Sequence, residues 1–227
     1  QINLHKTLFL NMKIFYLKRL EDEGKTLEVR DLQLKELQEK LTLYEPLAKE
    51  YTNYQERRTM KQRTLEAVNK QIQAEFQSAY IYLAMSARFE EQKMSGAASW
   101  MRIQWEEETS HALKLFDHLI RRGQTPALFD LTHPVVTFDS ALDAFEQVLD
   151  HERHITKLIH ELYEVAVEEK DYALQTLLHW FIDEQVEEEE NAEGIVDSLR
   201  LAGDSGQGIF LVDRELGQRQ PDVEDEE

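Results

Sequence analysis

The segment Trp105-Glu-Glu-Glu108-Thr-Ser-His111 places a carboxylate and an imidazole on the apolar face of a long helical pattern. Met101, Ala112 and Leu115 share the face of Glu108, because they follow the spacing of i, i+3, i+4 and i+7 that marks one side of a helix. A carboxylate buried without a partner is costly. Its position on the inner face of a helix therefore needs a specific explanation.

Three further helical patterns carry a glutamate at the corresponding position, and these residues are Glu75, Glu152 and Glu188. The simplest common explanation is a shared cation, and oxygen ligands with one imidazole suit iron or manganese. The i, i+3 spacing of Glu108 and His111 puts both donors on one face of a helix. Taken alone, this pair is a weak signal, because a lone histidine on a helix is usually an ordinary surface or core residue. Its occurrence together with the three other glutamates favours a metal site.

The composition indicates a helical protein and excludes several functions. Glycine and proline are scarce in the 227 residues, at 8 and 4, and charged residues make up 31%. The net charge of −19 argues against nucleic acid and anionic membranes as partners. Cysteine is absent, which rules out thiolate ligands and permits the reducing cytoplasm, where we expect the protein to lie. No run approaches the roughly 20 apolar residues of a membrane-spanning helix.

Helix signals divide residues 60–219 into a four-helix pattern with a fifth helix behind it. We expect helices over about 61–91, 95–122, 140–169 and 172–201, with Ser95, Ser140 or Asp139, and Asp171 as N-caps and Gly123 as a C-terminal stop. The segment 124–137 contains two prolines and is long enough to cross the length of a bundle. One long crossover between two antiparallel pairs defines the ferritin-like topology.

The two ends of the chain carry different signals. A turn at 203–208 precedes the apolar segment 209–216, for which we expect a short helix that packs against other subunits. Residues 220–227 form an acidic tail that we expect to be disordered.

Residues 1–59 form a separate extension, and the net charge changes from about +1 over residues 1–60 to −20 over the remainder. Leucines at 27, 34 and 41 recur every seven residues, which predicts a helical, coiled-coil-like segment. The first 20 residues are basic and apolar. They fit a targeting or docking peptide that binds a protein partner, and they fit equally a helix that packs on the protein's own surface.

Several motifs in the same order and spacing resemble the bacterial non-haem ferritins, over about 70% of the chain. They are Asn69-Lys-Gln-Ile-Gln-Ala-Glu75, Trp105-Glu-Glu-Glu108-Thr-Ser-His111, His151-Glu152 and Glu184-Gln185-Val-Glu187-Glu188, followed by the fifth-helix region. The resemblance implies an all-α, ferritin-like four-helix bundle with a long crossover and a short fifth helix.

The resemblance also implies roles for individual residues. Glu75, Glu108 and His111 would hold the first iron, and Glu108 would bridge to a second iron held by Glu152, with Glu188 and Gln185 nearby. A third iron site would comprise Glu107, Glu184, Glu187 and Glu188. Tyr82 would lie beside the dinuclear centre and supply a hydrogen bond or an electron, although by itself it also fits an ordinary core aromatic. Glu189 and Glu190 are expected in solvent.

The implied activity is ferroxidation with iron storage. Two Fe(II) ions at the dinuclear centre would reduce O2 or H2O2, and the ferric product would grow as mineral inside a shell of 24 identical subunits. The alternative is a ferritin-like scaffold or tether, in which the extension docks a partner and storage is secondary.

Other members of the superfamily fit less well. A haem-binding bacterioferritin would carry methionine at position 109, where this chain has Thr109, and histidine where it has Glu188, so no haem is expected. A rubrerythrin would need a cysteine-rich domain. A mini-ferritin would lack the fifth helix, and an encapsulated ferritin-like protein would be a shorter chain with two helices.

Overall fold

A computed structural model of the chain describes residues 60–221, together with nine isolated helical residues at positions 18, 19, 29, 32, 35, 36, 39, 42 and 46. The chain divides into two compact units, Gln1–Arg58 and Thr59–Glu227. The coiled coil and docking peptide predicted within residues 1–59 lie outside the described residues apart from these nine positions. The same holds for the predicted disorder of the acidic tail from residue 222 onward.

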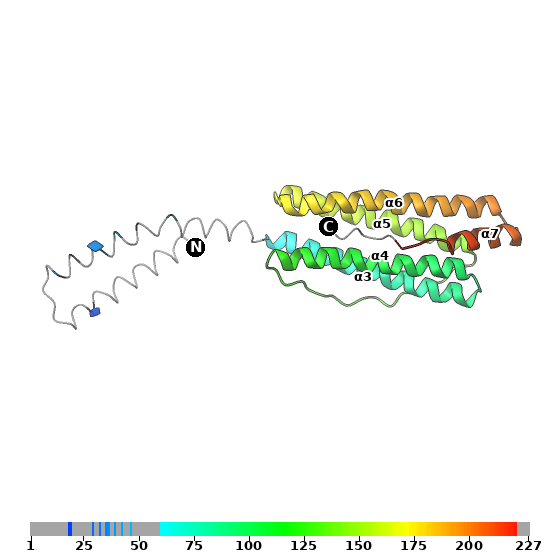
Figure 1. Cartoon of the computed structure of the whole chain (residues 1–227), viewed down its shortest axis with the longest axis horizontal. Helices are drawn as coiled ribbons and strands as arrows, with labels where there is room; N and C mark the ends of the chain where they lie inside the picture. The colour runs from blue at the N-terminus through cyan, green and yellow to red at the C-terminus, as the bar shows by residue number, and fades with distance from the viewer. Residues whose placement is uncertain are drawn as a thin grey trace. The chain divides into compact units, whose positions relative to one another are not determined.

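Four long helices form the bundle, which confirms the all-α prediction: α3 (Gln62–Glu91), α4 (Ser95–Arg121), α5 (Ala141–Glu168) and α6 (Tyr172–Ala202). Helix α3 pairs with α4 and α5 pairs with α6, while α3 also contacts α5. The connection between α4 and α5 runs along the outside of the bundle for most of its length (Figure 1). This arrangement is the ferritin-like bundle with one long crossover.

Capping residues explain several of the helix ends. The Ser140 hydroxyl accepts a hydrogen bond from the Asp143 N–H, and the Asp171 carboxylate accepts one from the Leu174 N–H, as predicted. Gly123 has a φ of 72°, which explains why a glycine stops α4. The prediction of Ser95 as an N-cap is wrong, because Ser95 is the first helical residue and Met94 stands at the cap without a side-chain hydrogen bond.

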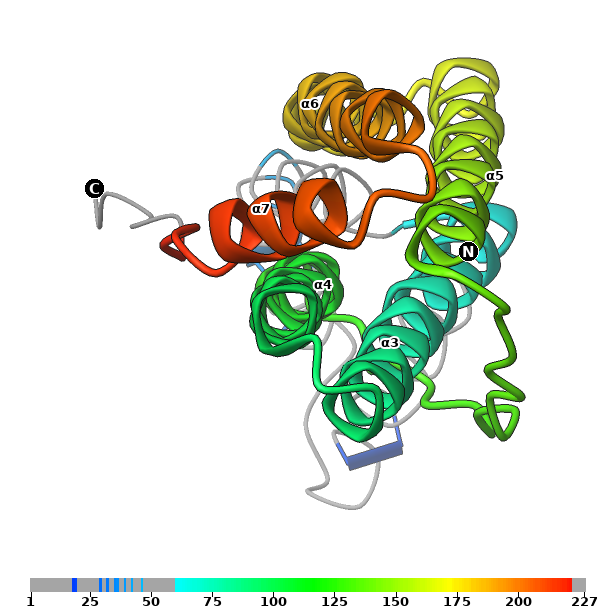
Figure 2. The ribbon, with the colours of Figure 1, turned by 90° about the vertical axis from the view of Figure 1, so that its right-hand side faces the viewer.

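The capping function at the start of α4 is supplied from the other end of the chain. Helix α7 (Gly206–Leu216) lies across one end of the bundle, between α4 and α6 (Figure 2). Asp213 Oδ1 accepts a hydrogen bond of 2.8 Å from the Ala97 N–H in the first turn of α4. Gly96 permits this contact, since a Cβ there would lie 1.6 Å from the Asp213 carbonyl oxygen.

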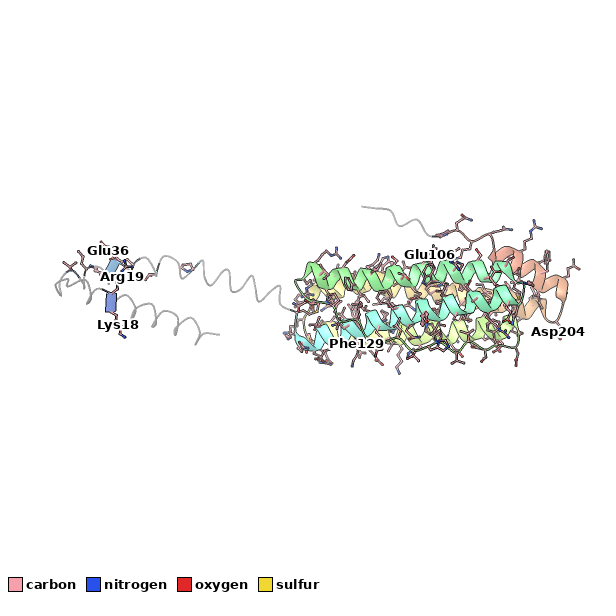
Figure 3. All side chains as sticks on the ribbon, turned by 90° about the horizontal axis from the view of Figure 1, so that it is seen from below. Lys18, Arg19, Glu36, Glu106, Phe129 and Asp204 are labelled. Carbon is pink, nitrogen blue, oxygen red and sulfur yellow. The ribbon has the colours of Figure 1, made fainter. Side chains whose placement is uncertain are left out.

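Helix α7 begins three residues earlier than the predicted residue 209, because the Ser205 hydroxyl caps it by accepting from the Gly208 N–H. The turn that precedes it contains Asp204 and lies at the end of the bundle (Figure 3). Leu216 is buried against the bundle, whereas Phe210 and Leu211 remain 63% and 54% exposed. Part of the apolar surface of α7 is therefore available to another subunit.

The apolar core consists of two clusters. One contains Tyr82, Phe89, Trp100, Phe145 and Val196, and lies toward the end that α7 covers. The other contains Val68, Ile72, Leu115, Ile159 and Phe181, and lies toward the opposite end. In each of the four long helices, a buried glutamate lies between the residues of the two clusters, and these are Glu75, Glu108, Glu152 and Glu188. The bundle therefore has a polar layer across its middle.

Candidate metal centre

The polar layer contains all four glutamates of the predicted dinuclear site. Glu75, Glu108 and Glu152 are each 1% exposed, and Glu188 is 5% exposed. They come from α3, α4, α5 and α6, one from each helix, since each occupies an inner-face position between the two apolar clusters. Four acidic groups in one buried layer repel each other unless protons or cations neutralise them.

Glu75, Glu108 and His111 form the most compact group of potential ligands. One ligand atom from each residue lies within 4.8 Å of those of the other two. His111 Nδ1 lies 3.7 Å from Glu108 Oε2. Within the described part of the chain, Glu75 Oε2 and Glu108 Oε2 have no hydrogen-bond partner although both atoms are buried. Buried carboxylate oxygens without a donor suit a cation, so these residues fit a hard divalent metal.

Glu152 and Glu188 form the opposite half of the layer, and both are held by neutral donors. Glu152 Oε1 accepts a hydrogen bond from the Tyr82 hydroxyl, and Glu152 Oε2 lies 3.3 Å from Gln185 Nε2. Glu188 Oε2 accepts a hydrogen bond of 2.9 Å from Gln104 Nε2. These donors fix the orientation of the two carboxylates.

Burial raises the pKa of every carboxyl group in the layer. It raises the pKa of Glu75 to about 7, against a hydrogen bond from Gln71, and that of Glu152 to about 7, against hydrogen bonds from Tyr82 and Gln185. Burial and the negative charge of Glu152 raise the pKa of Glu188 to about 8. Burial, followed by the charges of Glu152, Glu75 and Glu188, raises the pKa of Glu108 well above its ordinary value. In the absence of metal, the layer therefore retains protons near neutral pH.

The predicted third-site residues lie at the edge of the layer, and they differ in their surroundings. Glu107 Oε2 lies 2.8 Å from Arg219 Nη2. Glu184 Oε2 lies 4.0 Å from His111 Nε2. Glu187 is exposed and lines an open groove of about 600 Å³ beside α6 and α7. Glu188 is the one member that faces the buried layer.

The prediction that Glu189 lies in solvent is wrong in part. Its side chain is 32% exposed, and its Oε1 accepts a hydrogen bond of 2.5 Å from the Thr156 hydroxyl on α5. Its Oε2 lies 3.8 Å from Arg153 Nε. In the acidic run 187–190 on α6, Glu188 therefore faces the buried layer and Glu189 contacts α5, whereas Glu190 is exposed.

Several residues that support the layer were not predicted from the sequence. Gln71 Nε2 donates a 2.9 Å hydrogen bond to Glu75 Oε1, and its position four residues before Glu75 is a signal that could have been used. The Trp180 ring stands edge-on to the His111 ring, with centroids 5.3 Å apart. Gln104 and Arg219 contact each other although they are 115 residues apart in the sequence, so no local pattern reveals this contact.

None of the helices within the described residues is both long and apolar enough to cross a membrane. Comparison with known proteins then identifies relatives of the domain. The family model of the ferritin-like domain matches residues 65–202. A bacterial non-heme ferritin of Bacteroides fragilis is 44% identical over 153 residues, which is 67% of this chain and 95% of that protein.

Two further relatives support the same assignment. The bacterial non-heme ferritin of Staphylococcus aureus is 35% identical over 160 residues, covering 70% of this chain and 96% of that protein. Among solved structures, the open pore ferritin of the hyperthermophilic archaeon Archaeoglobus fulgidus is 44% identical, with a TM-score of 0.70. That similarity covers 71% of this chain and 99% of the archaeal chain.

Proposed function

Because this chain belongs to the ferritin family, we propose that it stores iron after oxidising Fe(II) to Fe(III) at a dinuclear centre in the polar layer. The observation that carries the proposal is the buried group of Glu75, Glu108 and His111, with two carboxylate oxygens that lack hydrogen-bond partners among the described residues. Glu152 and Glu188 would complete the second half of the centre. Glu108 would bridge the two iron ions.

Fe(II) is the substrate, and the residues of the layer prepare it for oxidation. Binding of two Fe(II) ions would release protons from the carboxyl groups of raised pKa, because a metal ligand must be deprotonated. The two ions would supply two electrons to O2, which with two protons gives H2O2, or two electrons to H2O2, which with two protons gives two waters. Carboxylates favour Fe(III) over Fe(II), which helps to drive the oxidation.

Storage requires a shell, and the family membership together with the exposed face of α7 supports one. Phe210 and Leu211 remain exposed on α7 in the single subunit, and contact with another copy would bury them. We propose a homo-oligomer of 24 subunits in the cytoplasm. The third iron site, which would comprise Glu107, Glu184, Glu187 and Glu188, would lie between the dinuclear centre and the exterior of the bundle, and the acidic groove would lead ferric ions away from it.

The experiment that tests the proposal is aerobic loading with many Fe(II) ions per subunit, followed by size exclusion with protein and iron recorded separately. We expect iron to co-elute with a very large species. Glu108→Ala should lower the initial oxidation rate by more than about tenfold, since even residues that only support metal ligands have effects of that size. Glu106→Ala is the matched control, because Glu106 is exposed on the same helix (Figure 3).

Two results would contradict the proposal. An unchanged oxidation rate in Glu108→Ala, with normal helicity, would remove the site assignment. Oxidation of only about two irons per chain in a small oligomer would instead favour the tether function, because a dinuclear centre would be present without a mineral core.

A further inference from the structure

The side chain of Arg219 enters the edge of the polar layer from the segment after α7. Its Nη2 lies 2.8 Å from Glu107 Oε2, and its Nη1 donates a hydrogen bond to Gln104 Oε1. Its Cζ lies 5.0 Å from the centroid of the Trp100 ring. The side chain is only 19% exposed. Three side chains on α4 therefore hold one guanidinium, whereas an accidental ion pair on the surface gives an arginine only one partner.

The same guanidinium acts on Glu188 across the layer. Gln104 accepts from Arg219 through Oε1 and donates to Glu188 Oε2 through Nε2, so one amide links the cation to this carboxylate. The positive charge of Arg219 also lowers the pKa of Glu188, against the effect of burial. A permanent cation is thus already bound to Glu107 and linked through Gln104 to Glu188, and both carboxylates belong to the residues proposed for the third iron site.

We propose that Arg219 is an exchangeable internal counter-ion of the third site, and that a metal ion binds there only by displacing its guanidinium. This inference rests on the proposed iron-storage function. Both cations use Glu107, so a metal at this position and the docked Arg219 exclude one another. Metal binding would consequently release the segment after Leu216 from α4.

The surroundings of Arg219 allow this exchange. The open groove is lined by Arg219 itself and by three exposed acidic residues, which are Glu187, Glu190 and Glu215. A displaced guanidinium can therefore leave Glu107 without losing all of its negative neighbours. Arg219 lies only three residues beyond the end of α7, so a local rearrangement is sufficient and α7 itself need not move.

The first test measures metal affinity with Zn(II), a probe that binds carboxylates and imidazole and undergoes no oxidation. Calorimetric titration of the whole protein should resolve the dinuclear centre and a weaker third class of site. Arg219→Gln should tighten the third class by about tenfold, because a charge-assisted contact no longer has to be broken. Arg214→Gln removes the same charge from an exposed position of α7 and should change the affinity by less than about twofold.

Two further variants keep this test informative. Arg219→Lys retains the charge but cannot contact Gln104 and Glu107 in the same forked geometry, so its third-site affinity should be intermediate. In a Glu107→Gln background the additional change Arg219→Gln should have no effect, because the shared carboxylate is gone.

The second test uses the wild-type chain and has no dependence on Arg219 variants. Trypsin cleaves after an arginine only when the guanidinium can enter the protease pocket, so the Arg219–Gln220 bond reports release of Arg219. Saturating Zn(II) should accelerate release of residues 220–227 by about tenfold, because cleavage follows the population of the open form. Glu107→Gln should be cleaved rapidly with or without Zn(II). A small peptide substrate, digested in parallel, corrects for direct effects of Zn(II) on trypsin.

The outcomes separate this inference from the proposed function. If Zn(II) fails to bind the wild-type protein more tightly than Glu108→Gln, the dinuclear centre itself is wrong. If that centre binds normally, the inference about Arg219 is overturned by equal third-site affinities in the wild type and Arg219→Gln. It is also overturned by a cleavage rate after Arg219 that does not respond to Zn(II).

Discussion

The Tyr82 hydroxyl donates a hydrogen bond to Glu152 Oε1, which joins α3 to α5 in the middle of the bundle. Tyr82 is 1% exposed, and its ring stands edge-on to that of Trp100 at 6.3 Å between centroids. The ring thus belongs to the apolar cluster, while the hydroxyl belongs to the polar layer. One oxygen of Glu152 is committed to this hydroxyl, and the other faces Gln185.

We predict that Tyr82→Phe weakens metal binding at the Glu152 half of the centre and spares the other half. The effect on the second metal should be about tenfold, because loss of a supporting hydrogen bond disorients the ligand. Zn(II) titration in which the two binding steps are resolved measures this. Tyr80→Phe, at an exposed position of the same helix, is the control. Two unchanged binding steps would show that the hydroxyl has no role in positioning Glu152.

The raised pKa of Glu75 predicts how the metal-free protein responds to pH. The folded state holds the Glu75 proton up to a pH of about 7, whereas the unfolded chain releases it near the ordinary glutamate pKa of 4.5. Stability from this group is therefore fully present below pH 4.5, and it declines as pH rises toward 7. In the presence of a chelator, the free energy of unfolding of Glu75→Gln should exceed that of the wild type by roughly 3 kcal/mol at pH 8. At pH 4.5 the two free energies should match.

Denaturant unfolding at the two pH values measures this difference. Glu90→Gln, an exposed change on the same helix, should show no such pH dependence. Saturating Zn(II) should make the wild type more stable than Glu75→Gln at pH 8, because only the wild type can then use Glu75 as a ligand. A Glu75→Gln variant that is less stable than the wild type at pH 8 in chelator would contradict the raised pKa.

Local sequence signals were sufficient for the fold and for the inner-face glutamates. Ser140, Asp171 and Gly123 cap helices through contacts with residues three or four positions away. Their roles could therefore be predicted from neighbouring residues alone. Glu75 and Glu108 could be recognised because they break an apolar periodicity. Contacts between distant segments leave no such pattern. Ser95 was consequently misassigned as a cap, since the acceptor for the first turn of α4 is Asp213 on α7.

The close contact between Gly96 and Asp213 predicts that Gly96→Ala disrupts the docking of α7. A Cβ would meet the carbonyl oxygen of Asp213 at 1.6 Å, and a backbone atom cannot move aside locally. The free energy of unfolding of the variant should fall by about 1–3 kcal/mol, and α7 should become accessible to proteases. Gly194→Ala is the control, because nothing lies within 4 Å of its Cβ and alanine favours the helix by up to about 1 kcal/mol. Equal melting temperatures for the two variants would contradict a tight α4–α7 contact.

The second compact unit should fold without the extension if its first residues are retained. Met60 is 4% exposed, and Lys61 Nζ lies 2.7 Å from Glu169 Oε2, so a chain that begins at Met60 keeps both contacts. Deletion of residues 1–59 should leave helicity and iron loading unchanged. Deletion of residues 1–64 should lower the free energy of unfolding by about 2 kcal/mol or more, because it also removes the buried Met60 and Thr64. Aggregation of the shorter deletion, seen by light scattering, would mean that the extension is integral to the fold.

The contact between Asp213 and the Ala97 N–H also sets an order of events during translation. The first turn of α4 receives its acceptor from a residue synthesised 116 positions later. At about 5–20 residues per second, the ribosome needs roughly 6–23 s to reach it. Arg219 follows six residues after Asp213. The nascent chain therefore contains every glutamate of the polar layer before it contains the groups that close the end of the bundle.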